Sequence, residues 1–395
     1  MSKNGNKNAS LGGRLKGGVK RFSLSIFLGA NICTIVLMWL CVALTFISPD
    51  TMPRLSLLTL AFPVFLAVDI LFILFWLLFH VRLVWVPILG ALLVGGYILD
   101  YCPLNFSTNS NTTTDSSITI ISYNVGYMKT DEQKEELIRF INTSDADIIC
   151  LQELSTYFLK KHKEWIDTTA YHPLQVKNVA VFSRLPFLSD TIHIDYPTRS
   201  NHSMACWIDC YGDSLLILNN HLESNHLSPE EMSEYTNTIT DPNKESIKSS
   251  SQMLMGKLSE AAAYRGAQTD SICAIVERNA NHPVIVCGDL NDTPISYPYQ
   301  RLARHLTSAY RKKGLGPGFT FSRRSFPVRI DHLFYSDDWD IVSCRIDRAI
   351  SASDHYPLIV RLDKKNALNH LFRINFPPFT LWLRKKDVSL HAFMY

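Results

Sequence analysis

The chain has 395 residues, with 39 Lys and Arg against 36 Asp and Glu, giving a formal net charge of +3. This length allows one large or two modest domains, and so small a charge neither requires nor excludes a nucleic-acid partner. The nine cysteines form no C-x-x-C pair and no zinc-ligand spacing, which excludes the common Cys-based zinc modules. The hydrophobic fraction of 47% hides a division, because residues 23–100 are overwhelmingly apolar whereas residues 101–395 resemble a soluble domain.

The first 100 residues predict an integral membrane protein. Residues 1–22 are a basic, Gly- and Asn-rich tail without an acid, which we expect to be flexible and cytoplasmic. Three apolar runs follow in 23–100, at Phe22–Ile47, Leu55–Phe79 and a shorter one at Leu83–Leu99, and we expect each to cross the bilayer as a helix. Three crossings would place every residue after Asp100 in the periplasm or outside the cell. A cleaved signal peptide and a buried hairpin of soluble helices are the competing interpretations.

One acid, Asp69, lies in the middle of the second apolar run. A charge at that depth costs roughly 2.5–3.5 kcal/mol on insertion scales, so we expect the side chain to face another helix. It is the one acid in the run and has no chain of polar partners there, which favours a role in packing or assembly over transport.

The remainder is divided into a polar linker at 101–117, a catalytic domain at 118–363 and a basic, aromatic C-terminal tail at 364–395. Short apolar and β-branched runs alternate with amphipathic stretches, which predicts a mixed α/β domain. We expect helices at 132–142 and 252–280, a polar insertion at 224–251, and strands at 118–124, 148–153, 179–183, 204–209, 215–219, 284–289, 329–335 and 356–361.

The most informative stretch is Val-Ile-Val-Cys-Gly-Asp289-Leu-Asn291, followed by Asp-Thr-Pro. It predicts a buried strand that ends in a carboxylate and a carboxamide, and these two side chains project from the same side of an extended chain. Such a pair suits a hard cation such as Mg²⁺, or a water molecule that must be aimed at phosphorus. A strand-ending Asx turn is the alternative for this stretch taken alone.

Six separated blocks resemble the endonuclease/exonuclease/phosphatase family in the family's order. They are Ser-Tyr-Asn124-Val, Leu-Gln-Glu153, Asn-Asn-His221-Leu, Gly-Asp289-Leu-Asn291, Arg-Ile-Asp331-His and Ser-Asp354-His355-Tyr-Pro. Relatives in that family include deoxyribonuclease I, abasic-site endonucleases, neutral sphingomyelinases and inositol-polyphosphate 5-phosphatases. The resemblance implies a four-layer sandwich, in which two β-sheets lie face to face between helices and the site lies at one lip.

The resemblance also implies a role for each matched residue. Glu153 would be the main metal ligand, assisted by Asn124, with Asp354 near the metal, and the ion would be Mg²⁺, with Mn²⁺ as the alternative. Asp289 would orient and deprotonate the attacking water, and Asn291 would hold water or phosphate. His355 and His221 would contact the phosphate, while Asp331 would orient His221 or another donor. Arg265 resembles a position that reaches phosphate, with surface solvation as its alternative.

The substrate class stays open. Eight basic residues lie between 301 and 329. They could bind a nucleic-acid backbone or a phospholipid head group, or they could form a solvated surface without a ligand. Three hypotheses follow: a metal-dependent phosphodiesterase or nuclease, a phospholipid or sugar-phosphate hydrolase of the same superfamily, and a catalytically silent membrane-tethered binding module. Residues 23–100 would contact the lipid bilayer, and no protein partner can be derived.

Overall fold

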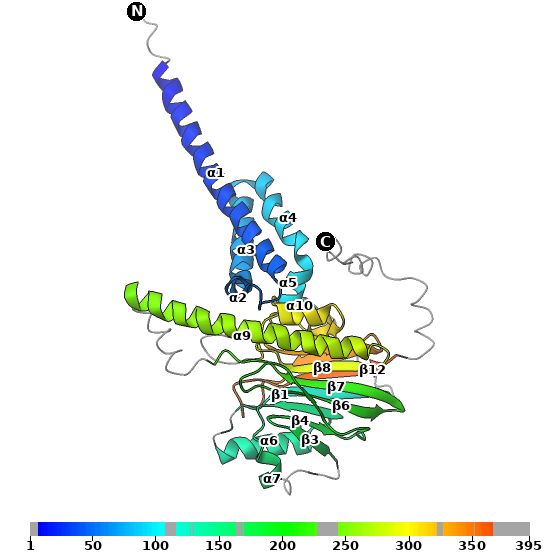
Figure 1. Cartoon of the computed structure of the whole chain (residues 1–395). Coiled ribbons are helices and arrows are strands. Elements are labelled where there is room, and N and C mark those ends of the chain that lie inside the picture. The colour runs from blue at the N-terminus through cyan, green and yellow to red at the C-terminus, as the bar shows by residue number, and fades with distance from the viewer. Residues whose placement is uncertain are drawn as a thin grey trace, which may run out of the picture.

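The computed structural model describes residues 7–106, 116–126, 128, 130–162, 167, 170–226, 244–321, 327–350 and 352–365. For 7–20 and 244–250 it describes the backbone alone. The predicted C-terminal tail, apart from its first two residues, and residues 227–243 of the polar insertion lie outside these ranges. Figure 1 shows a group of helices standing on one side of a larger α/β domain.

The helical group begins with α1 (Lys7–Leu44), which continues N-terminally through most of the predicted flexible tail. That expectation is wrong from Lys7 onward, since each residue added to an existing helix gains one hydrogen bond without a new nucleation step. After α2 (Pro53–Ser56) and η1 (Leu57–Ala61) come α3 (Phe62–Phe79), η2 (Val81–Leu83), α4 (Trp85–Leu93) and α5 (Gly95–Tyr101).

Two helices are long and apolar enough to cross a membrane, at Arg21–Leu44 and Pro53–Phe79. The third predicted span is broken, because Val81–Leu93 and Gly95–Tyr101 meet at an angle of 69°. These helices supply a third span only if the bent pair is counted as one. Asp69 is buried among the helices as expected, where its Oδ1 accepts a hydrogen bond from Asn31 Nδ2 at 3.2 Å.

The α/β domain contains two six-stranded sheets. The first has the order β11-β12-β1-β2-β4-β3 and the second β5-β6-β7-β8-β10-β9. Only β1–β2 and β7–β8 pair in parallel among the strand pairs described. The strands are β1 (Ser117–Asn124), β2 (Ile148–Gln152), β3 (His172–Val176), β4 (Val179–Ser183), β5 (Ile192–Ile194), β6 (Ser203–Cys210), β7 (Asp213–His221), β8 (Val284–Asp289), β9 (Thr307–Ser308), β10 (Asp331–Tyr335), β11 (Trp339–Ile346) and β12 (Leu358–Lys364).

Three apolar layers hold the two sheets and their helices together, as the predicted four-layer α+β sandwich requires. The central layer joins residues such as Ile120 and Cys150 of the first sheet to Ile217 and Ile285 of the second. Alternate residues of the same strands face outward, because side chains along a strand point to opposite faces. The first sheet is covered by α6 (Asp131–Thr143) and the second by α9 (Lys244–Arg278) and α10 (Tyr297–Ala303).

Helix α6 illustrates how the sequence specifies these outer layers. Thr130 accepts a hydrogen bond from Gln133 N, and the Gln133 side chain accepts one from Thr130 N, which is a capping box. Its buried side chains, Leu137, Ile138 and Ile141, are spaced to form one apolar face. The burial of each contributes about 1.5–3 kcal/mol. Helix α9 starts at Lys244, earlier than predicted, and therefore includes the end of the predicted polar insertion.

The helical group is joined to the α/β domain by a buried polar contact, which we call the junction. Asp100, near the end of α5, is ion-paired with Arg311 of α11 (Ala309–Lys313) and accepts a hydrogen bond from Gln300 Nε2 at 3.0 Å. Arg329 is buried and donates to the carbonyl oxygens of Asp100 and Tyr101. Nearby, the Arg304 guanidinium lies 4.7 Å from the centre of the Phe46 ring.

Candidate active site

The sheet topology brings the predicted residues to one edge of the sandwich. Asn124, His221 and Asp289 are the last residues of β1, β7 and β8, and Glu153 directly follows β2. Because β1–β2 and β7–β8 are parallel pairs, their carboxyl ends meet at the same edge. Strands β10 and β12 run antiparallel to these neighbours, so their beginnings reach that edge as well. Asp331 is thereby paired directly with Asp289, and His355 lies three residues before β12.

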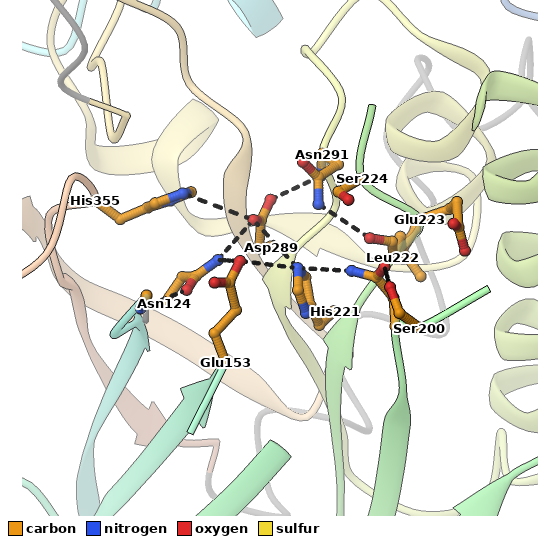
Figure 2. Close-up of polar contacts among 12 residues, drawn as sticks. Asn124, Glu153, Ser200, His221, Leu222, Glu223, Ser224, Asp289, Asn291 and His355 are labelled. Atoms are coloured by element: carbon orange, nitrogen blue, oxygen red, sulfur yellow. Dashed lines mark hydrogen bonds and ion pairs between the residues drawn. The ribbon is translucent and has the colours of Figure 1, made fainter. Parts of the chain in front are cut away.

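Asn124 connects the two sheets at the centre of this edge (Figure 2). Its Nδ2 donates to Asp289 Oδ2 at 2.9 Å and to Glu153 Oε1 at 3.1 Å. The amide oxygen is turned away and accepts from Gly126 N at 3.0 Å. Glu153 has a φ of 57°, a left-handed conformation that costs a residue with a Cβ about 1–3 kcal/mol. Its side chain is 20% exposed, which leaves the carboxylate open to solvent or a ligand.

Gly288 explains why glycine precedes Asp289 in the motif. Its φ is 130°, and a Cβ at this position would lie 1.9 Å from the carbonyl oxygen of Asn220 on β7. Only glycine therefore allows β7 and β8 to approach closely enough to set His221 beside Asp289. Asn291, with a φ of 51°, donates its backbone N–H to Asp289 Oδ1 at 2.7 Å and its side-chain amide to Leu222 O at 3.0 Å.

The two predicted histidines have different partners. His355 Nδ1 lies 2.8 Å from Asp331 Oδ2, and its Nε2 is directed at Asp289 Oδ2 from 3.9 Å. Asp331 thus orients His355 rather than His221, which is the second of the two outcomes expected for it. His221 Nε2 instead lies 2.8 Å from Asn201 Nδ2 and 3.4 Å from Glu153 Oε1.

Burial and neighbouring charge separate the protonation states of these groups. Burial acts against a charged His355, but the charge and hydrogen bond of Asp331 outweigh it and raise the pKa to about 10. Burial, reinforced by the charge of His355, lowers the pKa of His221 to about 3. Burial and the charge of Asp331 raise the pKa of Asp289 to about 7, and burial also raises the pKa of Glu153. The edge therefore holds a cationic and a neutral histidine beside carboxylates that lack full compensation.

The donor atoms present can hold a hard cation. Asp289, Asp331 and His355 offer ligand atoms that lie within 4.8 Å of one another. Asp331 Oδ1 is buried and has no hydrogen-bond partner among the described residues. Two crowded carboxylates, of which Asp289 has a raised pKa, and an unpartnered oxygen are the surroundings that a divalent ion would neutralise.

Two further predicted site residues, Asp354 and Arg265, lie outside the group formed by Asp289, Asp331 and His355. Asp354 is exposed, and its Oδ1 is 3.6 Å from where a Cβ on Gly126 would lie, so it stands at the rim near Asn124. Arg265 is buried in α9, where Nε contacts Asp292 Oδ2 at 3.1 Å and one terminal nitrogen donates to Glu223 O and Asn225 Oδ1. The expected alternative of surface solvation is wrong, because this guanidinium holds two loops behind Asn291.

Most of the basic stretch at 301–329 serves packing in the described part of the chain. Arg301 is paired with Asp270 and Glu277, while Arg304, Arg311 and Arg329 contact the helical group. The predictions for Arg323 and Arg324 lie outside the described residues. These cations therefore do not form the continuous phosphate-tracking surface considered from the sequence.

Two asparagines that were not predicted as site residues, Asn219 and Asn201, contact the residues or strands that form the site. Asn219 Nδ2 donates to the carbonyl oxygens of Leu151 and Ala180, and its Oδ1 accepts from Gln152 Nε2 at 2.7 Å. These bonds fasten the second sheet to the first directly below the metal-ligand candidates. Asn219 lies inside a recognised block, so its position was a usable signal. Asn201 lies in a loop without any pattern, and only the fold places it against His221.

Comparison with known proteins gives a family and several similar folds. The model described as "Endonuclease/Exonuclease/phosphatase family" matches residues 121–249 and 274–355, and one described as "Domain of unknown function (DUF8431)" matches residues 24–101. No curated protein matches the sequence.

Similar solved structures include the human Nocturnin catalytic domain, with 18% identity and a TM-score of 0.46, covering 63% of this chain and 94% of that one. An endonuclease/exonuclease/phosphatase from Bacteroides vulgatus has 16% identity and a TM-score of 0.47, covering 64% and 100%. Humanized D. rerio TDP2 has 14% identity and a TM-score of 0.44, covering 63% and 100%. Since the family model spans more than half of the sequence, the chain belongs to the endonuclease/exonuclease/phosphatase family.

Proposed function

We propose that the protein is a membrane-anchored, divalent-metal-dependent phosphoester hydrolase of the phosphodiesterase or endonuclease type. The observation that carries this proposal is the convergence of Asn124, Glu153, His221, Asp289, Asp331 and His355 on one edge of the sandwich. A purely structural edge would have no reason to gather three carboxylates and two histidines with such different proton affinities. A silent binding module is disfavoured because every one of these groups is present.

The metal would be held by Glu153 and Asp354 with help from Asn124. Carboxylate and amide oxygens favour Mg²⁺, with Mn²⁺ as the alternative. Asn124 would have to turn its amide over to serve as a ligand, because its nitrogen now faces Glu153. A bound divalent ion supplies charge stabilisation to a phosphoryl oxygen.

Asp289 is the proposed base. With its pKa raised to about 7, a substantial fraction of its carboxylate is ready to take a proton from water near neutral pH. Asn291 N holds Asp289 Oδ1, and Asn124 Nδ2 holds Asp289 Oδ2 as long as the Asn124 amide is not turned toward a metal. In this scheme Asn291 positions Asp289, and its own amide oxygen can orient the attacking water.

The histidines would stabilise the negative charge that develops on phosphorus-bound oxygens. His355, held by Asp331, presents a charged Nε2–H toward the site, and a preorganised donor of this kind is worth several kcal/mol. His221 is neutral and would act as a hydrogen-bond donor or acceptor set by Asn201. The substrate-binding role of Arg265 stays a prediction, and its contacts support positioning of the loop that contains Asn291.

The test is hydrolysis of a generic bis-aryl phosphodiester by the full chain in detergent or nanodiscs. We expect activity with Mg²⁺ or Mn²⁺, loss with EDTA, and at least a ~100-fold lower kcat in Asp289→Asn. Asp340→Asn, an exposed acid on β11, is the matched control and should retain the parent activity. Parent-like turnover in Asp289→Asn would remove Asp289 from the mechanism. Failure of the parent to cleave plasmid DNA, phospholipid vesicles, sugar phosphates and the bis-aryl ester would support the binding module.

The location of the catalytic domain is proposed separately. With residues 1–22 in the cytoplasm and three crossings, the domain lies in the periplasm or outside the cell. A reporter fused after Tyr395 should be active only in an extracytoplasmic compartment. Cytoplasmic reporter activity would mean that the bent pair α4–α5 does not cross the bilayer.

A further inference from the structure

A cleft of about 670 Å³ lies beside the junction, away from the residues assigned to catalysis. We call it the junction cleft and define it by Asn105, Lys313, Leu315, Phe319, Arg345 and Arg348, which are among its lining residues. It is formed by the segment that leaves α5, the loop after α11 and the end of β11.

The junction cleft is cationic. Arg345 is paired with Asp347 at 3.0 Å, whereas no carboxylate of the described residues pairs with Lys313 or Arg348. Arg348 instead lies with its guanidinium carbon 5.9 Å from the centre of the Tyr356 ring. Two positive charges in one cleft without a protein counter-charge favour an anionic ligand.

The walls of the cleft are built rigidly. Tyr310 donates its hydroxyl to Leu315 O at 2.9 Å, and a Cβ on Gly318 would lie 2.1 Å from Tyr310 Cζ, so the loop packs directly on that ring. Asn105 Nδ2 donates to Arg311 O and Gly314 O and so fastens the opposite wall. A preformed cleft avoids the ordering cost that weakens binding to a flexible surface.

The rim of the cleft is apolar. Leu104 forms a β-bridge with Leu315, and these side chains are 59% and 55% exposed, while Phe106 next to them is 80% exposed. Exposed leucine and phenylalanine beside basic residues are characteristic of surfaces that rest in the interfacial layer of a bilayer.

The position of the cleft matches such a layer. Asn105 follows Tyr101, the last residue of α5, by four residues, so its Cα lies at most ~14 Å from the end of that helix. Figure 1 shows α5 at the end of the helical group that meets the α/β domain. If the helices cross a bilayer, the cleft therefore opens close to the phospholipid head groups.

We propose that the junction cleft binds the phosphate-bearing head group of an anionic membrane phospholipid, with Lys313 and Arg348 on the phosphate and the Leu104–Leu315 rim among the upper acyl carbons. The proposal rests on the membrane anchoring proposed above, and it does not depend on hydrolysis. The apolar rim favours an amphiphile over a nucleic-acid strand, which would gain nothing from exposed leucines.

The experiment is native mass spectrometry of the full chain released from nanodiscs that contain equal phosphatidylglycerol and phosphatidylcholine, in EDTA so that no metal-dependent turnover occurs. We expect the parent to retain phosphatidylglycerol preferentially. The double variant K313Q/R348Q should lose about 5-fold retention per charge, or about 25-fold in all. The matched control is R139Q/K160Q, which removes two charges from α6 and α7 (Phe158–His162) on the opposite side of the domain (Figure 1).

Equal retention in K313Q/R348Q and the parent would overturn the proposal, and so would an equal loss in both double variants, which would indicate unspecific attraction. Binding of a deoxythymidine oligonucleotide that K313Q/R348Q abolishes, with lipid retention unchanged, would assign the cleft to nucleic acid. If the double variant does not give a monodisperse protein, the exposed single variant Arg348→Gln makes the same test with a 5-fold expected loss. Retention in a protein inactive in every hydrolysis assay would uphold the cleft and refute only the catalytic proposal.

Discussion

Replacing Asp331 by asparagine removes the charge that faces His355 and leaves the size of the side chain unchanged. In the parent, Asp331 Oδ2 accepts from His355 Nδ1 at 2.8 Å, and both side chains are at least 94% buried. An asparagine oxygen can still accept the same hydrogen bond. The substitution therefore tests the charge of Asp331 separately from the position of the imidazole ring.

The magnitude follows from the pKa of His355. The difference between about 10 in the folded protein and the ordinary value of 6.5 corresponds to ~5 kcal/mol of preference for the charged ring. Asp331 is the largest of the charges that raise this pKa, ahead of Asp289 and Asp354. We expect Asp331→Asn to lower the pKa by roughly 2 pH units or more, or ~3 kcal/mol.

The assay is the titration of the His355 ring by NMR in metal-free protein labelled with ¹³C-histidine, with His355→Gln used to assign the signal. A titration midpoint near 10 for His355 in Asp331→Asn would refute this reasoning. It would indicate that the charge of Asp289 raises the His355 pKa instead. Stability gives an independent check. Because the folded-state pKa of His355 is raised, its contribution is complete below pH 6.5 and is lost as pH rises from there through about 10. The free energy of unfolding should fall over this window in the parent and vary less in the variant.

Three further substitutions test the site. Glu153→Gln should lower turnover at least ~100-fold and weaken its dependence on Mg²⁺ concentration, so an unchanged metal titration would remove Glu153 from the ligands. Asn201→Ala should leave His221 without its amide partner and lower kcat about 10-fold with little change in KM, and an unaltered kcat would assign Asn201 to folding alone. Arg265→Met should leave Asp292 as an unpaired buried charge and lower the free energy of unfolding by about 3–5 kcal/mol. A parent-like melting temperature with a raised KM would instead support contact between Arg265 and substrate.

The sequence was sufficient to predict which polar residues stand at the ends of strands. Asn124, Glu153, His221 and Asp289 follow apolar runs whose period and length indicate strands, so their positions at strand ends could be predicted, while the family resemblance implied that they meet at one lip. The amphipathic pattern at 132–142 likewise predicted α6 to within a residue at each end. In each case a local pattern and the tertiary packing favour the same structure.

The partner of each histidine could not be predicted, because it depends on strand order. Asp331 meets Asp289 only because β10 pairs antiparallel with β8, and this pairing leaves His355 as the ring within reach. All four edge strands of the described sheets, β3, β5, β9 and β11, were missed because they are only partly apolar, and the first three are also short. The basic stretch at 301–329 was misleading for a similar reason, since composition does not reveal that Arg311 and Arg329 meet the end of α5.

The junction bears on how the proposed membrane-anchored hydrolase would meet its substrate. Arg329 is two residues from Asp331 and donates hydrogen bonds to two carbonyl oxygens in the last turn of α5, so the helical group is fastened close to the candidate active site. An enzyme on a flexible linker samples a large volume above the bilayer. An enzyme fixed to its membrane anchor acts at one height and one tilt. If the proposed anchor crosses a bilayer, the scissile bond would have to come to that height, and lengthening the connection between α5 and β1 should leave the reach of the site unchanged as long as the Arg329 hydrogen bonds persist.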